Sequence, residues 1–265
     1  MTDALDDLAR ELHLARARDR AVPPAARLSL GDARAVQHRL AALEDSPVVG
    51  FKIGATTVAT LDMVGLRRPF FGPLHARHHH PNGAAVRLPR SRPTSVELEA
   101  VVELARDLAL APDAAGPAEQ DAERVARVAD AVGSVRAGLE LVGTRLDLAP
   151  PGNGTALVAD GAGNVATVLG GGPGHVGGPD AVPEQPATLE IDGTRVASGR
   201  GRDSLGGHPF AMVAWLLGRR AFAGRGLRAG ELVYCGTHTG AVPVSPGQRV
   251  SADFGSLGTV SATLL

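Results

Sequence analysis

Short strand-like runs follow one another after about residue 88, and they constrain the fold more than any other feature of the chain. Each run is rich in apolar and β-branched residues, and turn-forming residues separate the runs. Asp192-Gly193, between two of them, is a strong signal for a two-residue hairpin. The predicted strands are 96–104, 135–142, 155–159, 165–169, 187–191, 194–198, 231–235, 249–254 and 258–264.

Helices are expected mainly before these strands. Apolar residues at helical spacing form one stripe from Leu5 to Ala15 and another from Ala33 to Leu43, and Pro23-Pro24 separates them. Thr56 or Thr57 can cap a third helix that reaches about Val64. Two further helices are predicted within the β-rich part, at 119–132 and 209–219.

We therefore predict an α+β fold with two parts. The first, residues 1–75, is a helical region that also contains a strand around Lys52. The second, residues 76–265, is a β-rich body that carries most of the candidate site.

Composition excludes several classes of function. The net charge is −1 and the chain has one Trp and one Tyr, so it lacks the basic surface and the stacking aromatics of a nucleic-acid-binding protein. No apolar run approaches the ~20 residues of a membrane span. The N-terminus is acidic, unlike a signal peptide, and the single Cys235 excludes an intrachain disulfide. We expect a soluble cytoplasmic protein that binds neither nucleic acid nor membrane.

Lys52 is the only lysine among the 27 lysine and arginine residues. Arginine always stays charged, whereas lysine can release a proton when its surroundings lower its pKa. In the strand-like run Val48–Gly54, residues Gly50, Lys52 and Gly54 share one face. Because the glycines leave space beside the ammonium, Lys52 is a candidate for proton transfer, although a solvated lysine at a sheet edge would fit the same pattern.

Two carboxylates share one face of the run 96–102. Its apolar residues alternate with Glu97 and Glu99, whose Cα atoms lie ~6.5–7 Å apart in a strand. Such close carboxylates repel unless a cation or a proton lies between them, and Mg²⁺ prefers oxygen ligands of this kind. A solvated polar face of a half-exposed strand is the alternative interpretation.

Glu140 adds a third carboxylate, on the mostly apolar strand 135–142 and on the same face as Gly138. A buried glutamate should be paired or bound to a metal. Together with Glu97 and Glu99 it could hold one Mg²⁺ or Mn²⁺ and leave positions for a bidentate 2-oxo or 2-hydroxy acid. Asp160, His238 and Thr239, in glycine-rich turns after predicted strands, are further candidates for substrate binding.

Motifs in this order resemble the 2-keto-4-pentenoate hydratase and 4-oxalocrotonate decarboxylase family, within the fumarylacetoacetate hydrolase superfamily. The resemblance extends from about Leu30 to Leu265, and the C-terminal third matches best. The motifs are Gly50–Gly54, Pro69–Leu74, Val96–Ala100, Leu139–Arg145, Leu205–Pro209, Val213–Leu216, Ala229–Glu231 and Leu257–Ser261.

The resemblance implies a mixed β-roll of the fumarylacetoacetate hydrolase type with an N-terminal helical part, assembled as a homo-oligomer. It implies a Mg²⁺ or Mn²⁺ site at Glu97, Glu99 and Glu140 and an active-site Lys52. Members act on 2-hydroxydienoates and their 2-oxo tautomers in the degradation of aromatic compounds. A metal chelated by such a substrate stabilises the charge of an enolate, and a nearby lysine could move the proton.

Three departures from the family pattern concern the handling of water. Phe70, a candidate substrate-binding residue, stands where hydratases usually have an Asp that is thought to help activate water. Gly161 and Gly163 replace the Asn and Ser of the family's A-D-N-A-S segment, and Gly143 replaces an Asp. Phenylalanine cannot transfer a proton, so either another group activates water or the reaction needs none.

Our main hypothesis is a metal-dependent lyase of the hydratase type that acts on a small 2-hydroxydienoate or 2-oxo unsaturated acid. A 4-oxalocrotonate-type decarboxylase is the first alternative, and a tautomerase or rearrangement enzyme of a biosynthetic pathway is the second. A hypothesis of another class is a non-catalytic subunit that stabilises a partner enzyme of the pathway. C–C bond hydrolysis is less well supported, because no water-activating base is evident.

Overall fold

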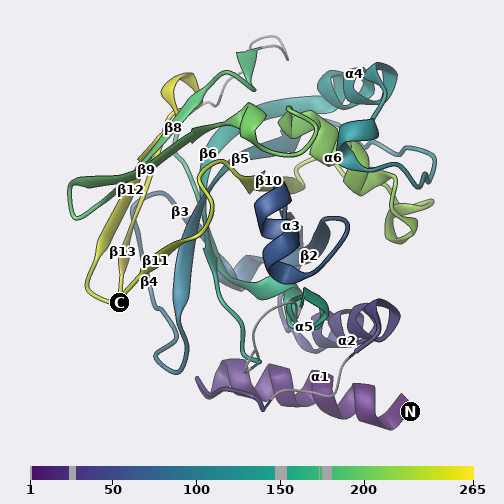
Figure 1. Ribbon diagram of the computed structural model, residues 1–265, viewed down its shortest axis with the longest axis vertical. Coiled ribbons are helices and arrows are strands. Elements are labelled where there is room, and N and C mark those ends of the chain that lie inside the picture. The colour runs from purple at the N-terminus through teal and green to yellow at the C-terminus, as the bar shows by residue number, and fades with distance from the viewer. Residues whose placement is uncertain (1, 24–27, 147–153, 173, 175–180) are drawn as a thin grey trace.

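Two β-sheets and two groups of helices make up the protein (Figure 1). The computed structural model describes residues 2–23, 28–146, 154–172, 174 and 181–265. The helices are α1 Thr2–Ala17, α2 Leu30–Leu43, α3 Val58–Val64, α4 Ala122–Ala131, α5 Gly154–Ala159 and α6 Pro209–Leu217.

The larger sheet has the strand order β2-β1-β10-β5-β6-β7-β3, and β11 pairs with β5 beside this path. The smaller sheet has the order β4-β13-β12-β8-β9. The strands are β1 Val48–Gly54, β2 Phe70–His75, β3 His79–Pro81, β4 Ala84–Val86, β5 Thr94–Leu104, β6 Val132–Val142, β7 Asn164–Leu169, β8 Pro186–Ile191, β9 Thr194–Arg200, β10 Leu232–Thr237, β11 Val242–Val244, β12 Arg249–Asp253 and β13 Thr259–Leu264.

Most of the predicted elements are present, and the α+β class is confirmed. Asp192 and Gly193 have φ values of 52° and 77°, as a tight hairpin between β8 and β9 requires. The predicted strand 155–159 is wrong, because this segment forms helix α5. A short apolar run is compatible with a strand or with a helix, and here packing against α2 favours the helix.

A single hydrophobic cluster joins the two sheets and α6. The apolar face of β5 contributes residues such as Leu98, the facing small sheet contributes Val250 and Val260, and α6 contributes Trp215. All four side chains are at most 2% exposed. The opposite face of β5 is therefore the one left for Glu97 and Glu99.

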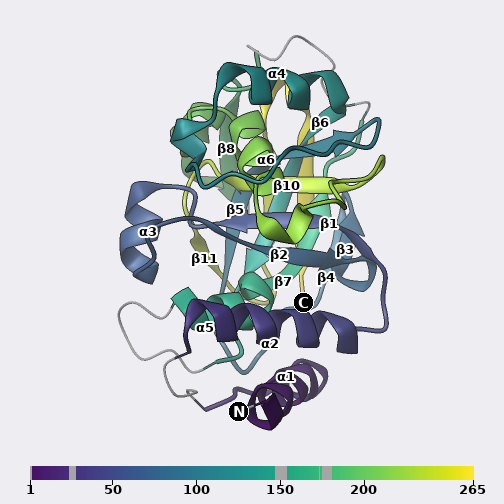
Figure 2. The same ribbon diagram turned by 90° about the vertical axis from the view of Figure 1, so that its right-hand side faces the viewer.

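The N-terminal helices form a second cluster against one end of the large sheet (Figure 2). Leu12 of α1 and Val36 and Leu40 of α2 pack with residues of α5 and with Phe70. The predicted boundary at residue 75 falls at the end of β2. Because β1 and β2 belong to the large sheet, this boundary divides that sheet. The division into two parts stays a prediction.

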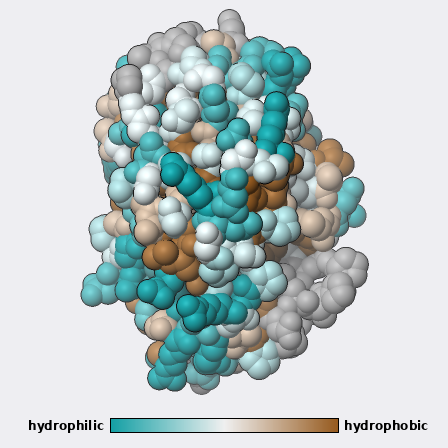
Figure 3. Space-filling model, turned by 90° about the vertical axis from the view of Figure 1, so that its left-hand side faces the viewer, coloured by the Kyte–Doolittle hydropathy of each residue, from teal (hydrophilic) through white to brown (hydrophobic). Residues whose placement is uncertain are grey.

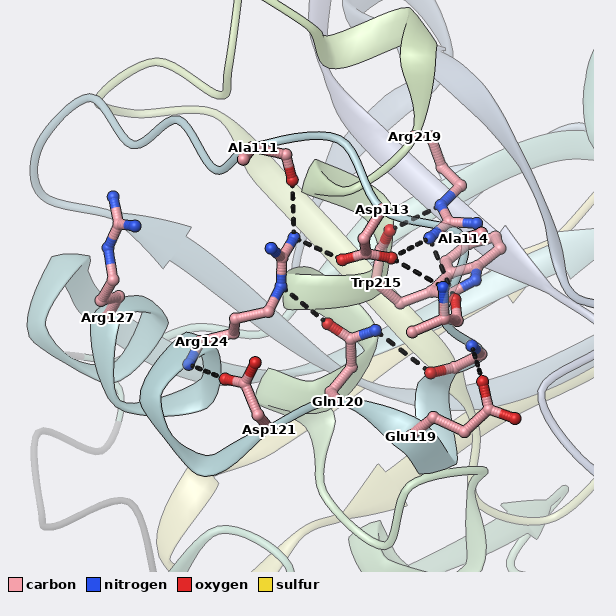
Figure 4. Close-up of polar contacts among 12 residues, drawn as sticks. Ala111, Asp113, Ala114, Glu119, Gln120, Asp121, Arg124, Arg127, Trp215 and Arg219 are labelled. Carbon is pink, nitrogen blue, oxygen red and sulfur yellow. Dashed lines mark hydrogen bonds and ion pairs between the residues drawn. The ribbon is translucent and has the colours of Figure 1, made fainter.

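Ion pairs connect the loop before α4 to α4 and to the end of α6, as Figure 4 shows. The Asp113 carboxylate forms ion pairs with Arg124 of α4 at 2.7 Å and with Arg219, which follows α6, at 2.8 Å. The Arg219 guanidinium also lies 4.9 Å from the centre of the Trp215 ring. This network fixes the loop on the core without approaching the glutamates.

The outer side of the smaller sheet faces solvent. Hydrophilic residues cover much of this side of the molecule, and hydrophobic residues show near its middle (Figure 3). Within the described residues, no helix combines the length and the apolar character that crossing a membrane requires.

Candidate active site

Three glutamates converge on one face of the large sheet. In the antiparallel pair β5–β6, Glu97 lies opposite Glu140 and Glu99 lies opposite Gly138. One carboxylate oxygen from each glutamate lies within 4.8 Å of those of the other two. Glu99 and Glu140 are fully buried, whereas Glu97 is partly exposed to a cavity. Strand register alone thus brings together the three residues that the sequence analysis selected.

Hydrogen bonds hold one oxygen of each of two of these carboxylates. The Gly236 backbone N–H donates to Glu99 Oε2 at 2.7 Å, and the Asn164 amide donates to Glu140 Oε1 at 2.9 Å. Glu99 Oε1 has no hydrogen-bond partner among the described residues. A buried acceptor without a partner is costly, so it marks a place where another group completes the site.

The pKa values of the glutamates show that the site favours a positive charge between them. Burial, and then repulsion by Glu140, raise the pKa of Glu97 to about 7, although Lys52 opposes the shift. Burial and the charges of Glu140 and Glu97 raise the pKa of Glu99 well above its usual value. A divalent cation would neutralise this repulsion, and three carboxylates are donors that hard cations prefer. The residues therefore fit a divalent metal ion.

The Lys52 ammonium lies beside the glutamates. Its Nζ is 3.0 Å from Glu140 Oε2 and 3.2 Å from the carbonyl oxygen of Ala162, and the residue is 2% exposed. Burial works to lower the pKa of Lys52, but the charges of Glu140, Glu97 and Glu99 outweigh it and the pKa is raised. Lys52 is thus a buried, charged member of the site and not a solvated edge residue.

The space beside Lys52 differs from the prediction. A side chain at Gly50 would meet the backbone of Leu232 on β10, so this glycine serves close strand packing. Next to Gly54, the Phe70 ring fills the space, and its centroid lies 5.7 Å from Lys52 Nζ. The prediction of empty space on both sides was therefore wrong, because the backbone occupies one side and an aromatic ring the other.

A left-handed turn presents a carbonyl group to Lys52. Gly161, Ala162 and Gly163 have φ values of 63°, 63° and 71°, and glycine tolerates this conformation best. Gly72 of β2 has no side chain to block the turn, since a Cβ there would lie 2.6 Å from Ala162 Cβ. The glycines that depart from the family pattern thus allow the Ala162 carbonyl to reach the ammonium.

A cavity of about 550 Å³ opens beside Lys52 and Glu97. Its wall is largely apolar, with Val64, Phe70 and Leu157 among the lining residues. Within the part of the chain that the structure describes, Glu97 is the group in this wall whose pKa of about 7 allows proton exchange near neutral pH. The raised pKa of Lys52 keeps its ammonium charged there, so it can act as an acid, and a lowered pKa of this lysine is not what the structure gives. The cavity is suited to a small unsaturated acid, with the glutamates at one side.

Not all of the predicted substrate-binding residues reach this cavity. Phe70 lines it. Asp160 is buried and forms an ion pair with Arg145, and it also accepts from the hydroxyl of Thr144 at 3.0 Å. Its carboxylate therefore positions neighbouring residues that line the cavity.

The loop after β10 turns its candidates away from the cavity. His238 is 5% exposed and its ring lies 5.6 Å from that of Phe254, while the Thr239 hydroxyl donates to the Gly240 carbonyl. Ala241 of this loop lines the cavity instead. Direct substrate contact by His238 or Thr239 stays a prediction that this placement does not support.

Asn164 is a site residue that the sequence analysis missed. It begins β7, is 8% exposed, and holds Glu140 through its amide. The backbone carbonyl of Asn164 in turn accepts from Arg16 of α1 at 3.1 Å. No local pattern marks such a residue, because its role depends on the pairing of β6 with β7.

Sequence comparisons relate the chain to two kinds of enzyme, although no family model matches it. The chain is 32% identical to the TodF product hydratase of Pseudomonas putida over 218 residues, which cover 81% of this chain and 75% of the relative. It is 32% identical to a 2-keto-4-pentenoate hydratase of Burkholderia vietnamiensis over 221 residues, covering 82% and 78%. It is 28% identical to a 4-oxalocrotonate decarboxylase of Pseudomonas putida over 220 residues, covering 81% and 76%.

Solved structures confirm the fold. The 4-oxalocrotonate decarboxylase of Pseudomonas putida G7, complexed with magnesium and adipate, superposes with a TM-score of 0.86 at 23% identity, covering all of this chain and 98% of that one. Fumarylpyruvate hydrolase of Pseudomonas aeruginosa, in complex with Mn²⁺ and pyruvate, gives a TM-score of 0.61 at 20% identity, covering 84% and 93%. The predicted fumarylacetoacetate hydrolase-like architecture is therefore correct.

Proposed function

Because this chain belongs to the family of 2-keto-4-pentenoate hydratases and 4-oxalocrotonate decarboxylases, we propose that it is a metal-dependent lyase of the hydratase type. Its substrate would be a small 2-hydroxydienoate or the corresponding 2-oxo unsaturated acid. The observation that carries the proposal is the convergence of Glu97, Glu99 and Glu140 beside Lys52, with Lys52 and Glu97 lining one cavity.

A divalent metal ion fits the three glutamates, and we propose Mg²⁺ or Mn²⁺. The donors are carboxylate oxygens, which both ions accept. Two structures of this fold are complexed with magnesium and with Mn²⁺, respectively. When bound, such an ion supplies Lewis-acid stabilisation for the negative charge of an enolate formed from a 2-oxo acid.

Lys52 is proposed to handle the proton. Its ammonium is held between Glu140 and the Ala162 carbonyl, at the wall of the cavity. A proton can pass between Lys52 Nζ and a carbon of the substrate when ketone and enol forms interconvert. The mostly apolar wall keeps bulk water away from this nitrogen, so the ionic contacts of the site are strong.

Phe70 is the specific observation that favours decarboxylation as a second candidate. Its ring lies next to Lys52, where an acidic side chain could have activated water. Loss of CO₂ from the distal carboxylate of an unsaturated 2-oxo diacid would leave its bonding electron pair, by conjugation, in the same stabilised enolate, and it needs no activated water. Hydration by this protein therefore requires that water be activated by Glu97, or by Lys52 after it has given up its proton.

One assay separates the candidates. The protein is incubated with 2-hydroxypenta-2,4-dienoate and Mg²⁺, and the dienoate absorbance is followed. Loss of absorbance supports the hydratase, and no loss rejects it. Release of CO₂ from 4-oxalocrotonate under the same conditions supports the decarboxylase, whereas conversion of either compound without hydration or CO₂ release would indicate a tautomerase.

The protein is also proposed to form a homo-oligomer, as its resemblance to the family implies. Light scattering on the purified protein tests this point. Association with a partner enzyme of the same pathway stays a prediction. A purely stabilising, non-catalytic role would require that the protein bind no Mg²⁺ or Mn²⁺ and that Glu97→Gln change nothing.

A further inference from the structure

The cavity extends well beyond the groups proposed for catalysis. Glu97 and Pro93, which directly precedes β5, both line it, and the four residues of chain between them span about 13 Å. An extended carbon chain advances about 1.2 Å per bond, so the five carbon atoms of 2-hydroxypenta-2,4-dienoate span about 5 Å. With its acid group at the glutamates, this compound would leave about 8 Å of the cavity unfilled.

The volume of the cavity leads to the same conclusion. The cavity holds about 550 Å³. The eight non-hydrogen atoms of the five-carbon dienoate fill at most about 240 Å³, even if each takes the ~30 Å³ that a water molecule has in the liquid. More than half of the cavity therefore stays open to a larger ligand.

Apolar side chains surround this extra space, which we call the remote part of the cavity. Its walls come from three elements: Val142 and Leu146 lie at and after the end of β6, Leu157 lies in α5, and Met63 and Val64 lie in α3. Val64 and Leu146 are buried, whereas Met63 is 62% exposed. Met63 thus stands at the rim, where a ligand in the remote part would cover it.

Three hydroxyl groups in the cavity wall are engaged within the protein. The Thr60 hydroxyl donates to the backbone carbonyl of the residue that caps α3, at 3.0 Å. The Thr144 hydroxyl donates to the Asp160 carboxylate at 3.0 Å, and the Ser91 hydroxyl donates to the Asp19 carboxylate at 2.8 Å. These donors need no partner from a ligand, so the remote part presents mainly carbon.

The two arginines in the wall do not change this character. Asp160 neutralises Arg145. The Nε and Nη1 atoms of Arg92 are buried and closed off from the cavity. Lys52 and Glu97 therefore mark the end of the cavity for the acid group, and the remote part is suited to an apolar group.

We propose that the remote part binds a bulky apolar substituent of the substrate. The substrate class is then an unsaturated 2-oxo or 2-hydroxy monocarboxylic acid with an alkyl or aryl group at the end remote from the acid. The five-carbon dienoate would fill only the inner part and bind more weakly. The inference rests on the proposed function for the binding of the acid end. Leu157 and Met63 would determine specificity, with no part in proton transfer.

Two stable ligands test the proposal. 2-Oxopentanoate and 2-oxooctanoate share the 2-oxo acid end and differ by three methylene groups. Full burial strengthens binding by about fourfold per methylene, or about 60-fold for three. Because Met63 leaves the outer end open to solvent, calorimetric titration of the Mg²⁺-loaded protein should show 2-oxooctanoate binding at least about tenfold more tightly. Equal affinities in the wild-type protein would overturn the proposal.

Variants assign the preference to the remote part. Leu157→Asn should reduce it to within about threefold and leave the affinities for 2-oxopentanoate and Mg²⁺ unchanged. Met63→Gln, at an exposed position that tolerates a polar residue, should reduce it by about two- to threefold. Val58→Thr is the matched control, because Val58 is an exposed apolar residue of α3 outside the cavity wall. Thermal unfolding of each variant shows whether it is folded.

Three further outcomes would count against the assignment. If the preference survived in both wall variants, the alkyl chain would bind elsewhere. If Leu157→Asn and Met63→Gln weakened both ligands equally, they would act on the acid end and the proposal would be wrong. Loss of the preference in Val58→Thr would place the chain outside the cavity. Failure of the proposed function looks different: neither ligand would then show binding that depends on Mg²⁺.

Discussion

Two walls of the cavity are built in different ways. The strand wall presents Lys52 and Glu97 to the cavity and is completed by the fully buried Glu99 and Glu140; all four stand within β1, β5 and β6. The loop wall consists of Phe70, Arg92, Gly143 and Ala162, which lie at strand ends or in the segments between strands.

This difference in construction matches a difference in role. The residues on strands are those proposed for the chemistry that the family shares, and the residues in loops are those that can set the substrate specificity of this chain. The strand wall carries the proposed metal-binding and proton-transferring groups, held by strand register, while the loop wall carries Phe70 and Gly143, two of the residues in which this chain departs from the family pattern. A rigid sheet keeps reacting groups at fixed positions, and loops can change without disturbing it. The predictions below test this division, beginning with the largest expected effect.

Lys52→Arg should lower kcat by about 10²- to 10⁴-fold, the range expected when a general acid–base group is lost. The guanidinium keeps the charge but cannot release its proton. It is also larger, and the Phe70 ring and Glu140 already surround the lysine. Steady-state kinetics measure the effect, and Mg²⁺ binding shows that the glutamates remain in place. A fully active variant would mean that Lys52 transfers no proton.

Glu99→Gln should weaken Mg²⁺ binding by at least about 100-fold, more than is usual for residues outside the ligand set. The amide oxygen can still accept from the Gly236 N–H, so the fold should persist. Without metal, the variant should be at least as stable as the wild type, because removal of a buried charge relieves repulsion from Glu140. Calorimetry and thermal unfolding check the two expectations.

Glu103→Gln is the matched control for this change. Glu103 stands on the same strand and pairs with Arg136 at 2.6 Å, away from the three glutamates. Unchanged Mg²⁺ binding is expected. If Glu99→Gln bound Mg²⁺ as tightly as the wild type did, the metal site would have to lie elsewhere.

The same division explains what could be predicted from the sequence. Alternation in 96–102 placed Glu97 and Glu99 on one face, because the side-chain period of a strand is two residues. Pairing with Glu140 followed once β5 and β6 were adjacent. The residues of the strand wall can thus be predicted from local patterns and from the resemblance to a family.

The loop wall was less predictable, because tertiary contacts determine it. The apolar run 155–159 predicts a strand, but these residues form helix α5. The helix is determined by packing against α2, which no local pattern shows. The Phe70 ring beside Lys52 reflects the pairing of β1 with β2, which places Gly54 opposite Phe70.

Asn164→Ala should weaken Mg²⁺ binding by about tenfold, the lower end of the range for residues that orient a metal ligand. The amide of Asn164 holds Glu140 Oε1 at 2.9 Å, and alanine leaves this oxygen free to rotate. Asn82→Ala is the control, since Asn82 accepts from the Ser261 N–H in the exposed turn after β3. Calorimetry that finds equal Mg²⁺ affinity in Asn164→Ala would contradict this role.

The smallest expected effect is a pH dependence of metal stabilisation. In the metal-free protein the pKa of Glu97 is raised to about 7, mainly by burial. Because this pKa lies above that of the unfolded chain, the protonated form stabilises the metal-free fold at low pH, and this contribution is lost as the pH rises through about 7. A cation needs the deprotonated carboxylates, so it stabilises the fold most where the proton is gone.

The gain in Tm on adding Mg²⁺ should therefore be a few degrees larger at pH 8 than at pH 6. Glu97→Gln should reduce this difference, because glutamine does not titrate and only the raised pKa of Glu99 then remains, whereas Glu103→Gln should keep it. A gain that is equal at both pH values would show that Glu97 is already ionised at pH 6. A larger gain at pH 6 would contradict the assignment of Glu97 as a metal ligand, since protons and metal would then not compete for the Glu97 carboxylate.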